Sequence, residues 1–94
     1  STLGTMSGIG AGWTHYAPAK AAANALVRQM SSCLTGERVS MFSLHPGWVA
    51  TDIGGFGAPV SPRRSARGLL SVVTASTMAD AGTFRDYQGG RMSW

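Results

Sequence analysis

The longest glycine-free stretch of this chain is centred on an alanine-rich run at positions 21–25, although 13 of its 94 residues are glycine. Alanine is the strongest helix former, and a stretch without glycine lacks the commonest helix breaker after proline. Ala22, Leu26 and Met30 follow one another at intervals of four residues, so they share one face of a helix. These features predict a single helix over about 15–33, which any fold for so short a chain must accommodate.

Polar and turn-forming residues mark the two ends of this helix. Thr14 precedes it and is a suitable N-cap. Pro18 is tolerated because it lies in the first turn, where the backbone N–H has no partner. Thr35-Gly36 follows the helix, and glycine most readily adopts the left-handed conformation of a C-cap. We therefore expect the helix to begin after Thr14 and to end with Gly36 as its left-handed cap.

The next segment changes from a helical pattern to a strand and then to a loop. Residues 39–44 alternate loosely in hydrophobicity and predict a strand, which the sequence His45-Pro46-Gly47 ends. Residues 46–60 contain four glycines and two prolines and predict a long loop. Loops of this length within small domains are usually functional.

A second helix and strand complete the alternation. Ser61-Pro62 predicts a helix start, with serine as the cap and proline in the first turn. An amphipathic stripe follows, made of Ala66, Leu69, Leu70 and Val73. Residues 83–87 predict a short last strand before the Gly89-Gly90 turn. The order helix, strand, helix, strand favours an α/β fold with a parallel sheet.

Composition excludes several classes of function. The chain has a formal charge of +4, 44% hydrophobic and 13% charged residues, and its basic residues are scattered apart from Arg63, Arg64 and Arg67. Without a basic run interleaved with aromatic residues, we expect no nucleic-acid partner. No apolar run of 18 residues or signal-peptide pattern is present, so we expect no membrane partner and a cytoplasmic location.

Cysteine and histidine usage argues against metal and disulfide chemistry. Cys33 is the only cysteine, so the chain has no internal disulfide and no cysteine-based metal site. His15 and His45 lie thirty residues apart and have no acidic partner at ligand spacing. We therefore predict that the chain carries no metal centre.

Tyr16 and Lys20 are the strongest local signal of chemistry. A separation of four residues places the phenol and the ammonium on the same face of the predicted helix. A nearby cation favours the phenolate, so this tyrosine could give a proton to a developing alkoxide or take one from an alcohol. The alternative interpretation is an ordinary surface pair at helical spacing.

The sequence YAPAK at 16–20, at the start of an alanine-rich helix, resembles the catalytic motif of the short-chain dehydrogenase/reductase family. The sequence LHPGWVATD at 44–52 resembles the family's Pro-Gly segment with its following valine and threonine. The glycine-rich run at 54–57, the Ser61-Pro62 helix start and the ending up to Trp94 resemble the carbonyl-reductase-type members. The resemblance covers essentially the whole chain, with its motifs in the family's order and spacing.

This resemblance implies an NAD(P)-dependent oxidoreductase that reduces a carbonyl or oxidises a secondary alcohol, with NADP or NAD as cofactor. It implies an α/β fold that forms the C-terminal part of a Rossmann-like doubly wound parallel sheet. The family's glycine-rich turn and its NAD or NADP selector would precede residue 1. We therefore expect residues 1–94 to be a single partial domain without the N-terminal cofactor-binding half. The full-length protein would be a homo-oligomer acting on a small-molecule carbonyl or alcohol.

The resemblance also assigns roles to individual residues. Tyr16 would be the general acid/base, and Lys20 would favour the phenolate and hydrogen-bond the nicotinamide ribose. Thr51 and the backbone of Val49 would hold the carboxamide of the cofactor. The turn formed by Pro46 and Gly47 would let the backbone approach the cofactor closely.

The resemblance leaves more than one candidate for the catalytic serine, because several hydroxyl residues precede Tyr16. The segment STLGTM at 1–6 resembles the serine-containing stretch of the subgroup, which makes Ser1 the favoured residue. Ser7 is an alternative that lies closer to Tyr16 than the family usually has it. Thr2 and Thr5 are further alternatives.

Two other functions are compatible with the sequence. The chain could be a catalytically inactive truncated fragment that acts, if at all, as a helix-mediated interaction piece, because the small residues at 21–25 suit close helix contact. It could also be a basic binding module that uses the arginines near position 64. Binding that depends on salt would support this module, whereas cofactor binding would not.

Overall fold

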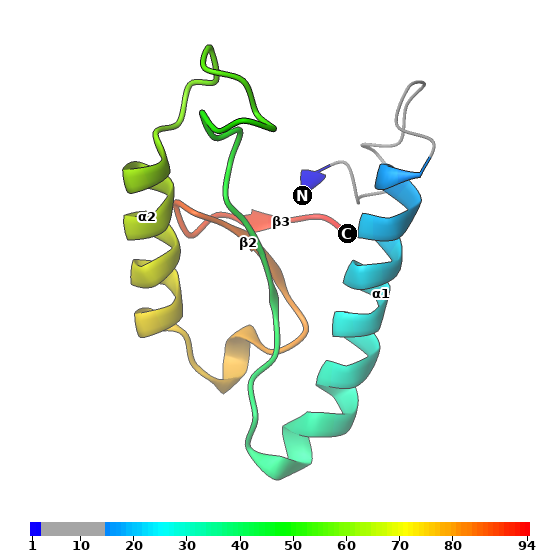
Figure 1. Ribbon diagram of the computed structural model, residues 1–94. Helices are drawn as coiled ribbons and strands as arrows, with labels where there is room; N and C mark the ends of the chain where they lie inside the picture. Colours follow the sequence, from blue (N-terminus) through cyan, green and yellow to red (C-terminus); the bar gives the residue numbers. More distant parts are fainter. Residues whose placement is uncertain (3–14) are drawn as a thin grey trace.

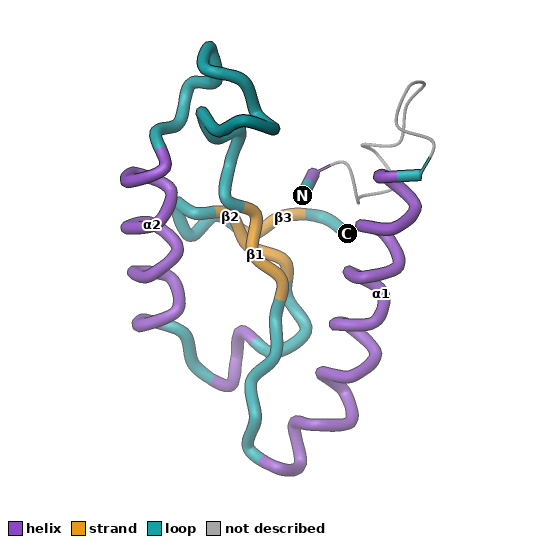
Figure 2. The backbone as a smooth tube through the Cα atoms, in the orientation of Figure 1, coloured by secondary structure: helices purple, strands orange, loops and turns teal. Residues whose placement is uncertain are grey.

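The computed structural model of this chain describes residues 1–2 and 15–94 (Figure 1). Its two helices are α1 (Tyr16–Leu34) and α2 (Pro62–Ala75), and its strands are β1 (Ser43–His45), β2 (Phe84–Asp86) and β3 (Arg91–Met92). Two short 3-10 helices, η3 (Thr35–Glu37) and η4 (Met78–Asp80), follow α1 and α2. Figure 2 shows the strands between the two helices. The order of elements confirms the α/β class.

The three strands form one sheet in the order β1-β2-β3. β1 and β2 are parallel, with Ser43 opposite Phe84 and His45 opposite Asp86, and α2 lies in the connection between them. This confirms the two parallel strands that the sequence predicted. β3 pairs antiparallel with β2, and the sequence did not predict it because a two-residue strand has no hydrophobic periodicity.

A tight turn joins β2 to β3. The Asp86 carboxylate accepts hydrogen bonds from the backbone N–H groups of Gln88 (2.9 Å) and Gly90 (2.7 Å). Gly89, with φ of +88°, donates its N–H to the Asp86 carbonyl at 3.0 Å. A carboxylate that satisfies two turn amides is a common way to stabilise such a reversal. The turn allows Trp94 to stack on Phe84, with ring centroids 5.6 Å apart.

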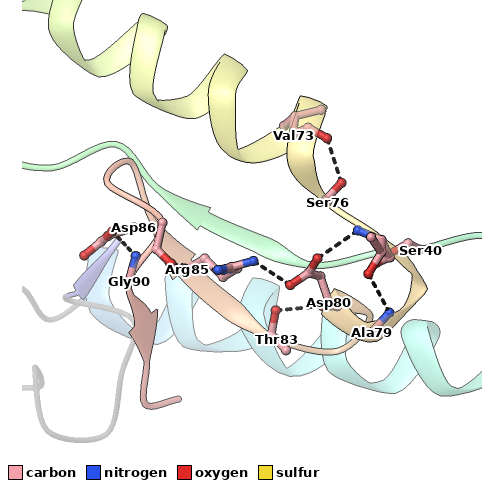
Figure 3. A network of polar contacts seen from close by, with 11 residues as sticks. Ser40, Val73, Ser76, Ala79, Asp80, Thr83, Arg85, Asp86 and Gly90 are labelled. Atoms are coloured by element: carbon pink, nitrogen blue, oxygen red, sulfur yellow. Dashed lines mark hydrogen bonds and ion pairs between the residues drawn. The ribbon is translucent and has the colours of Figure 1, made fainter.

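The connection from α2 to β2 is held by a polar network centred on Asp80 (Figure 3). One Asp80 carboxylate oxygen accepts the Thr77 N–H at 2.8 Å, and Thr77 caps the short helix in return, forming a capping box. The other oxygen is bound by the Arg85 guanidinium, which also donates to the Gly89 carbonyl at 2.8 Å. Thr83 donates to the Asp80 carbonyl at 2.6 Å. One acidic residue therefore links η4 to the strand that follows it.

The ends of α1 differ from the expectation. His15 occupies the N-cap position without a side-chain cap, and Thr14 lies outside the described residues. At the other end the chain continues directly into η3, and Arg38 adopts the left-handed conformation with φ of 59°. The prediction of Gly36 as the left-handed cap was wrong, because the added 3-10 turn moves the reversal two residues further along the chain.

The apolar face of α1 is exposed. Leu26 is 58% exposed, and Ala22 and Met30 also face solvent. The buried residues of this helix are Ala17, Asn24 and Ser31, which repeat every seven residues on the opposite face. Ser31 lies close to Gly82, where an added Cβ would be 3.4 Å from its hydroxyl oxygen. The sequence correctly placed Ala22, Leu26 and Met30 on one face, but that face is not packed against the other described residues.

α2 begins as predicted but packs through a different face. Ser61 accepts the Arg64 N–H at 3.2 Å, and Pro62 is the first helical residue. Ser65 and Val72 are buried, whereas Leu70 of the predicted stripe is 68% exposed. The stripe named in the sequence, Ala66, Leu69, Leu70 and Val73, is therefore not the face through which α2 packs among the described residues. The reason is Gly68, where an added Cβ would lie 2.2 Å from the Tyr87 carbonyl, so the helix backbone rests directly on the end of β2.

The buried apolar core of the described residues is small. It consists of Ala17, Val60, Val72 and Phe84. The accessible surface is 6253 Å², whereas roughly 5,200 Å² is typical of a folded monomer of this mass. None of the described helices is long and apolar enough to cross a membrane. The described helices and strands therefore enclose only a small apolar core.

Candidate active site

The predicted site residues gather toward one end of the molecule. Figure 1 shows the N-terminus, the first turn of α1 and the loop after β1 in the upper half of the view. This loop leaves the carboxyl end of β1, which is parallel to β2. In open α/β sheets, ligands bind outside the carboxyl ends of the parallel strands. The fold therefore brings the two sequence motifs to the edge where such a sheet binds ligands.

Tyr16 and Lys20 are in contact on α1. The Lys20 ammonium lies over the Tyr16 ring, 5.3 Å from the ring centroid. A cation at this distance is attracted by the negative face of the ring. The sequence predicted this pair from its four-residue spacing alone. The contact is with the ring face, and both side chains remain accessible to a ligand.

Ser1 lies close to the same pair. Its amine has a pKa below the usual value, first because burial disfavours the charge and then because Lys20 repels it. The side of α1 that carries Lys20 therefore faces the half-buried Ser1. Thr2 is exposed, while the alternatives Thr5 and Ser7 lie outside the described residues.

The turn after β1 is fixed by contacts with α2 and β2. The Pro46 carbonyl accepts a hydrogen bond from the buried Ser65 hydroxyl at 2.7 Å. Gly47 has φ of +85°, and an added Cβ would lie 2.9 Å from the Tyr87 ring. Both the backbone conformation and the close ring require glycine here. The turn is thus a rigid start for the long loop.

A short parallel bridge joins the two ends of this loop. Val49 is paired with Val60 through two bonds, from the Ala50 N–H to the Val60 carbonyl (2.8 Å) and from the Val60 N–H to the Trp48 carbonyl (3.2 Å). Backbone groups of successive residues in an extended strand point to opposite sides. The N–H of Val49 therefore points away from Val60 and is not used by the bridge.

Thr51 is held by the loop itself. Its hydroxyl accepts the Gly54 N–H at 3.2 Å, and its carbonyl accepts the Gly55 N–H at 2.7 Å. Trp48 donates its indole N–H to the Gly54 carbonyl at 2.7 Å. An added Cβ at Gly54 would lie 1.9 Å from the Val49 carbonyl, so this residue has no space for a side chain. These contacts fix Thr51 next to the backbone of Val49.

His45 is a site residue to which sequence reasoning gave no role. Its Nδ1 is buried and has no hydrogen-bond partner. The pKa of its imidazole lies below the usual value, mainly because of burial and further because the Ser1 amine repels the charged ring, while Asp86 opposes these effects. In the sheet His45 lies opposite Asp86, the last residue of β2. Its position at the end of a strand was the only signal in the sequence.

Apolar side chains project from the loop. Ile53 is 92% exposed and Phe56 is 88% exposed. Exposed apolar residues on a loop beside a polar site provide a surface for an apolar ligand. Among the described residues, no group of three or more histidine, cysteine or acidic side chains could hold a metal ion. The site thus offers a phenol, a cation and backbone donors.

Solved structures with the same fold cover the entire chain. The carbonyl reductase Sniffer of D. melanogaster superposes with a TM-score of 0.94 at 34% identity, and the NADPH-bound carbonyl reductase from chicken fatty liver with 0.87 at 32%. A short-chain dehydrogenase/reductase of Burkholderia multivorans with bound NADP superposes with 0.82 at 28%. The chain belongs to the short-chain dehydrogenase/reductase family. Its fold is the C-terminal part of the Rossmann-like sheet of that family, as the sequence predicted.

Sequence relatives agree with this membership. The C-signal protein of Myxococcus xanthus is 43% identical over 79 residues, which are 84% of this chain and 48% of that protein. A 1-hydroxy-2-glutathionyl-2-methyl-3-butene dehydrogenase of Rhodococcus is 32% identical over 87 residues. No family model matches the chain. The chain spans 48% and 38% of these two relatives and 38% to 41% of the three structures named above.

Proposed function

We propose that this short-chain dehydrogenase/reductase chain carries the catalytic half of an NAD(P)-dependent oxidoreductase. The reaction is the reduction of a carbonyl or the oxidation of a secondary alcohol. The observation that carries the proposal is the contact of Lys20 with the Tyr16 ring beside Ser1, at the carboxyl end of β1. A phenol held by a cation is suited to exchange a proton with an alcohol oxygen.

Proton transfer is the role of Tyr16. In the direction of reduction, its hydroxyl donates a proton to the substrate oxygen as negative charge develops there. Lys20 stabilises the phenolate that remains, because its ammonium lies 5.3 Å from the ring centroid. We assign the Ser1 hydroxyl to polarise the substrate carbonyl, which the electrostatic effect of Lys20 on the Ser1 amine supports. The bound cofactor, NADP or NAD, supplies or accepts the hydride.

The loop after β1 contains suitable groups for the nicotinamide end of that cofactor. The carboxamide needs a donor for its oxygen and an acceptor for its amide, and we assign the Val49 N–H and the Thr51 hydroxyl to these roles. We assign Lys20 to bond the ribose. The Pro46-Gly47 turn presents backbone without side chains at Gly47, which permits close approach. The NADP and NADPH bound in the structural neighbours support this proposal.

Fluorescence titration of the purified chain with NADPH and NADH tests the proposal. We expect saturable binding that Lys20→Ala weakens by at least several-fold, because the substitution removes a cation and a ribose donor. Arg28→Ala is the matched control, since it removes a charge from the same helix two turns further along. Tyr16→Phe should bind the cofactor but not transfer a proton. A chain that is folded by circular dichroism and binds neither nucleotide would show that it does not act alone.

The second candidate function is a non-catalytic interaction piece. It is favoured by the exposed apolar face of α1, because a helix face of this kind is normally covered by another surface. The chain also covers less than half of the length of the relatives named above. Under this function Tyr16 and Lys20 would be surface residues, and nucleotide binding would be absent.

A further inference from the structure

Trp48 is a large aromatic residue that lies near the start of the loop after β1 and is 63% exposed. Burial in the apolar core therefore does not account for a tryptophan at this position. Its indole N–H donates a hydrogen bond of 2.7 Å to the Gly54 carbonyl, six residues further along the chain. Tryptophan has this one donor and no acceptor. The contact with Gly54 is thus the specific feature of this side chain.

The peptide unit between Gly54 and Gly55 is bonded at both of its ends. Its carbonyl accepts the Trp48 indole N–H at 2.7 Å, and its N–H, on Gly55, donates to the Thr51 carbonyl at 2.7 Å. A peptide between two glycines rotates easily, because no side chain restricts the backbone on either side. Gly55 has φ of +80°, and an added Cβ there would meet nothing within 4 Å. The two hydrogen bonds, rather than side-chain packing, therefore select the orientation of this peptide.

The hydroxyl of Thr51 is oriented by the same part of the loop. It accepts the Gly54 N–H at 3.2 Å, and its oxygen lies 3.5 Å from the Val49 carbonyl, to which it donates. A hydroxyl has one hydrogen and two lone pairs. With the hydrogen directed at Val49 and one lone pair taken by Gly54, one acceptor position remains. Such a hydroxyl favours a ligand N–H over a ligand carbonyl.

We propose that Trp48 is a positioning residue for the carboxamide of the nicotinamide cofactor. Its indole holds the peptide between Gly54 and Gly55 and thereby keeps the Thr51 hydroxyl available as an acceptor for the carboxamide N–H. In this role Trp48 acts through the loop and not on the reacting atoms. The carboxamide as the ligand rests on the proposed function, whereas the hold of Trp48 on the loop does not.

Hydrogen exchange measured by NMR without nucleotide tests the hold on the loop. Trp48→Phe keeps an aromatic ring and removes the donor. We expect the Gly55 N–H to exchange roughly fivefold faster in this variant, the effect of losing one hydrogen bond of ordinary net strength. Trp94→Phe is the matched control, because it removes an indole N–H from a ring that stacks on Phe84 in the sheet. This control should leave the exchange of Gly55 unchanged.

Two dinucleotides test the role toward the carboxamide. NADP carries the carboxamide, and its 3-acetylpyridine analogue has a methyl group in place of the amide nitrogen, so the analogue lacks the N–H that Thr51 would accept. By calorimetric titration we expect Trp48→Phe to weaken the binding of NADP several-fold more than the binding of the analogue. A tryptophan that only stabilised the fold would affect both dinucleotides equally.

Three results would overturn the proposal. The first is equal exchange of Gly55 in the unaltered chain and in Trp48→Phe, and the second is equal weakening of NADP and its analogue. The third needs no variant: a Trp48 indole N–H that exchanges as fast in the unaltered chain as in a free tryptophan amide. If the unaltered chain binds neither dinucleotide, the proposed function fails and the carboxamide is excluded as the ligand. The exchange comparison then still decides whether Trp48 holds the loop.

Discussion

Gly54 and Gly57 lie three residues apart in the loop after β1, but their surroundings differ sharply. An added Cβ would lie 1.9 Å from the Val49 carbonyl at Gly54 and would meet nothing within 4 Å at Gly57. We predict that Gly54→Ala lowers the free energy of unfolding by about 1–3 kcal/mol, a typical cost of overpacking. Gly57→Ala should change it by less than about 0.5 kcal/mol. Urea denaturation of the two variants checks this, and equal effects would contradict the described loop.

His45 makes the stability of the chain depend on pH. Its folded-state pKa is lowered, chiefly by burial, whereas the unfolded value is about 6.5. The unfolded chain therefore binds this proton more readily. The stability linked to His45 is fully present above about pH 6.5 and is lost as the pH falls toward the folded pKa.

We predict that the free energy of unfolding decreases between pH 7 and pH 5 and that His45→Gln reduces this decrease. Denaturation at several pH values gives the slope of the free energy of unfolding against pH for the unaltered chain and for His45→Gln. His15→Gln is the comparison, because its exposed ring lacks the burial on which the effect depends. Identical slopes in the unaltered chain and in His45→Gln would show that His45 is not responsible.

Among single residues, the pair Tyr16 and Lys20 could be predicted from the sequence and His45 could not. The contact between Tyr16 and Lys20 depends only on helical geometry, in which residues four apart are neighbours. The environment of His45 depends on Ser1 and Asp86, which are brought to it from the two ends of the chain. Contacts of this kind leave no pattern in the local sequence.

At the scale of elements, Asp80 connects η4 to β2. Its carboxylate accepts the Thr77 N–H and binds Arg85. We predict that Asp80→Asn lowers the free energy of unfolding by about 1–2 kcal/mol, since hydrogen bonds to a charged group contribute about 1.5–3 kcal/mol and the amide keeps one acceptor. Asp52→Asn is the control, because Asp52 is exposed and has no ion pair among the described residues. Thermal unfolding should separate the two variants.

The positions of the helices could be predicted, but their packed faces could not. Alanine content and the Ser61-Pro62 start are local signals, and they located α1 to within one residue at each end and the start of α2. The faces are decided by what each helix meets. α2 packs through Gly68 because the end of β2 touches its backbone, and the apolar face of α1 is exposed in the part of the chain that the structure describes. A rule that buries the larger apolar residues therefore fails for both helices.

For the whole molecule, the exposed face of α1 predicts self-association at high concentration. Leu26 is 58% exposed on that face and Leu70 is 68% exposed on α2. We predict that Leu26→Lys shifts the monomer–dimer midpoint to at least tenfold higher concentration without changing the thermal midpoint. Leu70→Lys is the matched control and should shift it less. Sedimentation velocity measures the midpoint, and an equal shift in both variants would show that the contact is not specific to α1.

The separation of β1 from β2 along the chain determines the order in which the sheet folds. β2 and β3 are joined by a short turn, and hairpins of this kind form within about 1–10 μs. Ser43 pairs instead with Phe84, which is separated from it by the long loop and α2. Such distant contacts form slowly, because closing the loop costs entropy before the contacts contribute any stability. During synthesis β1 emerges first, yet its partner strand β2 follows only after the long loop and α2. The sheet can therefore form only after β2 has been synthesised, with the hairpin first and the pairing of β1 last.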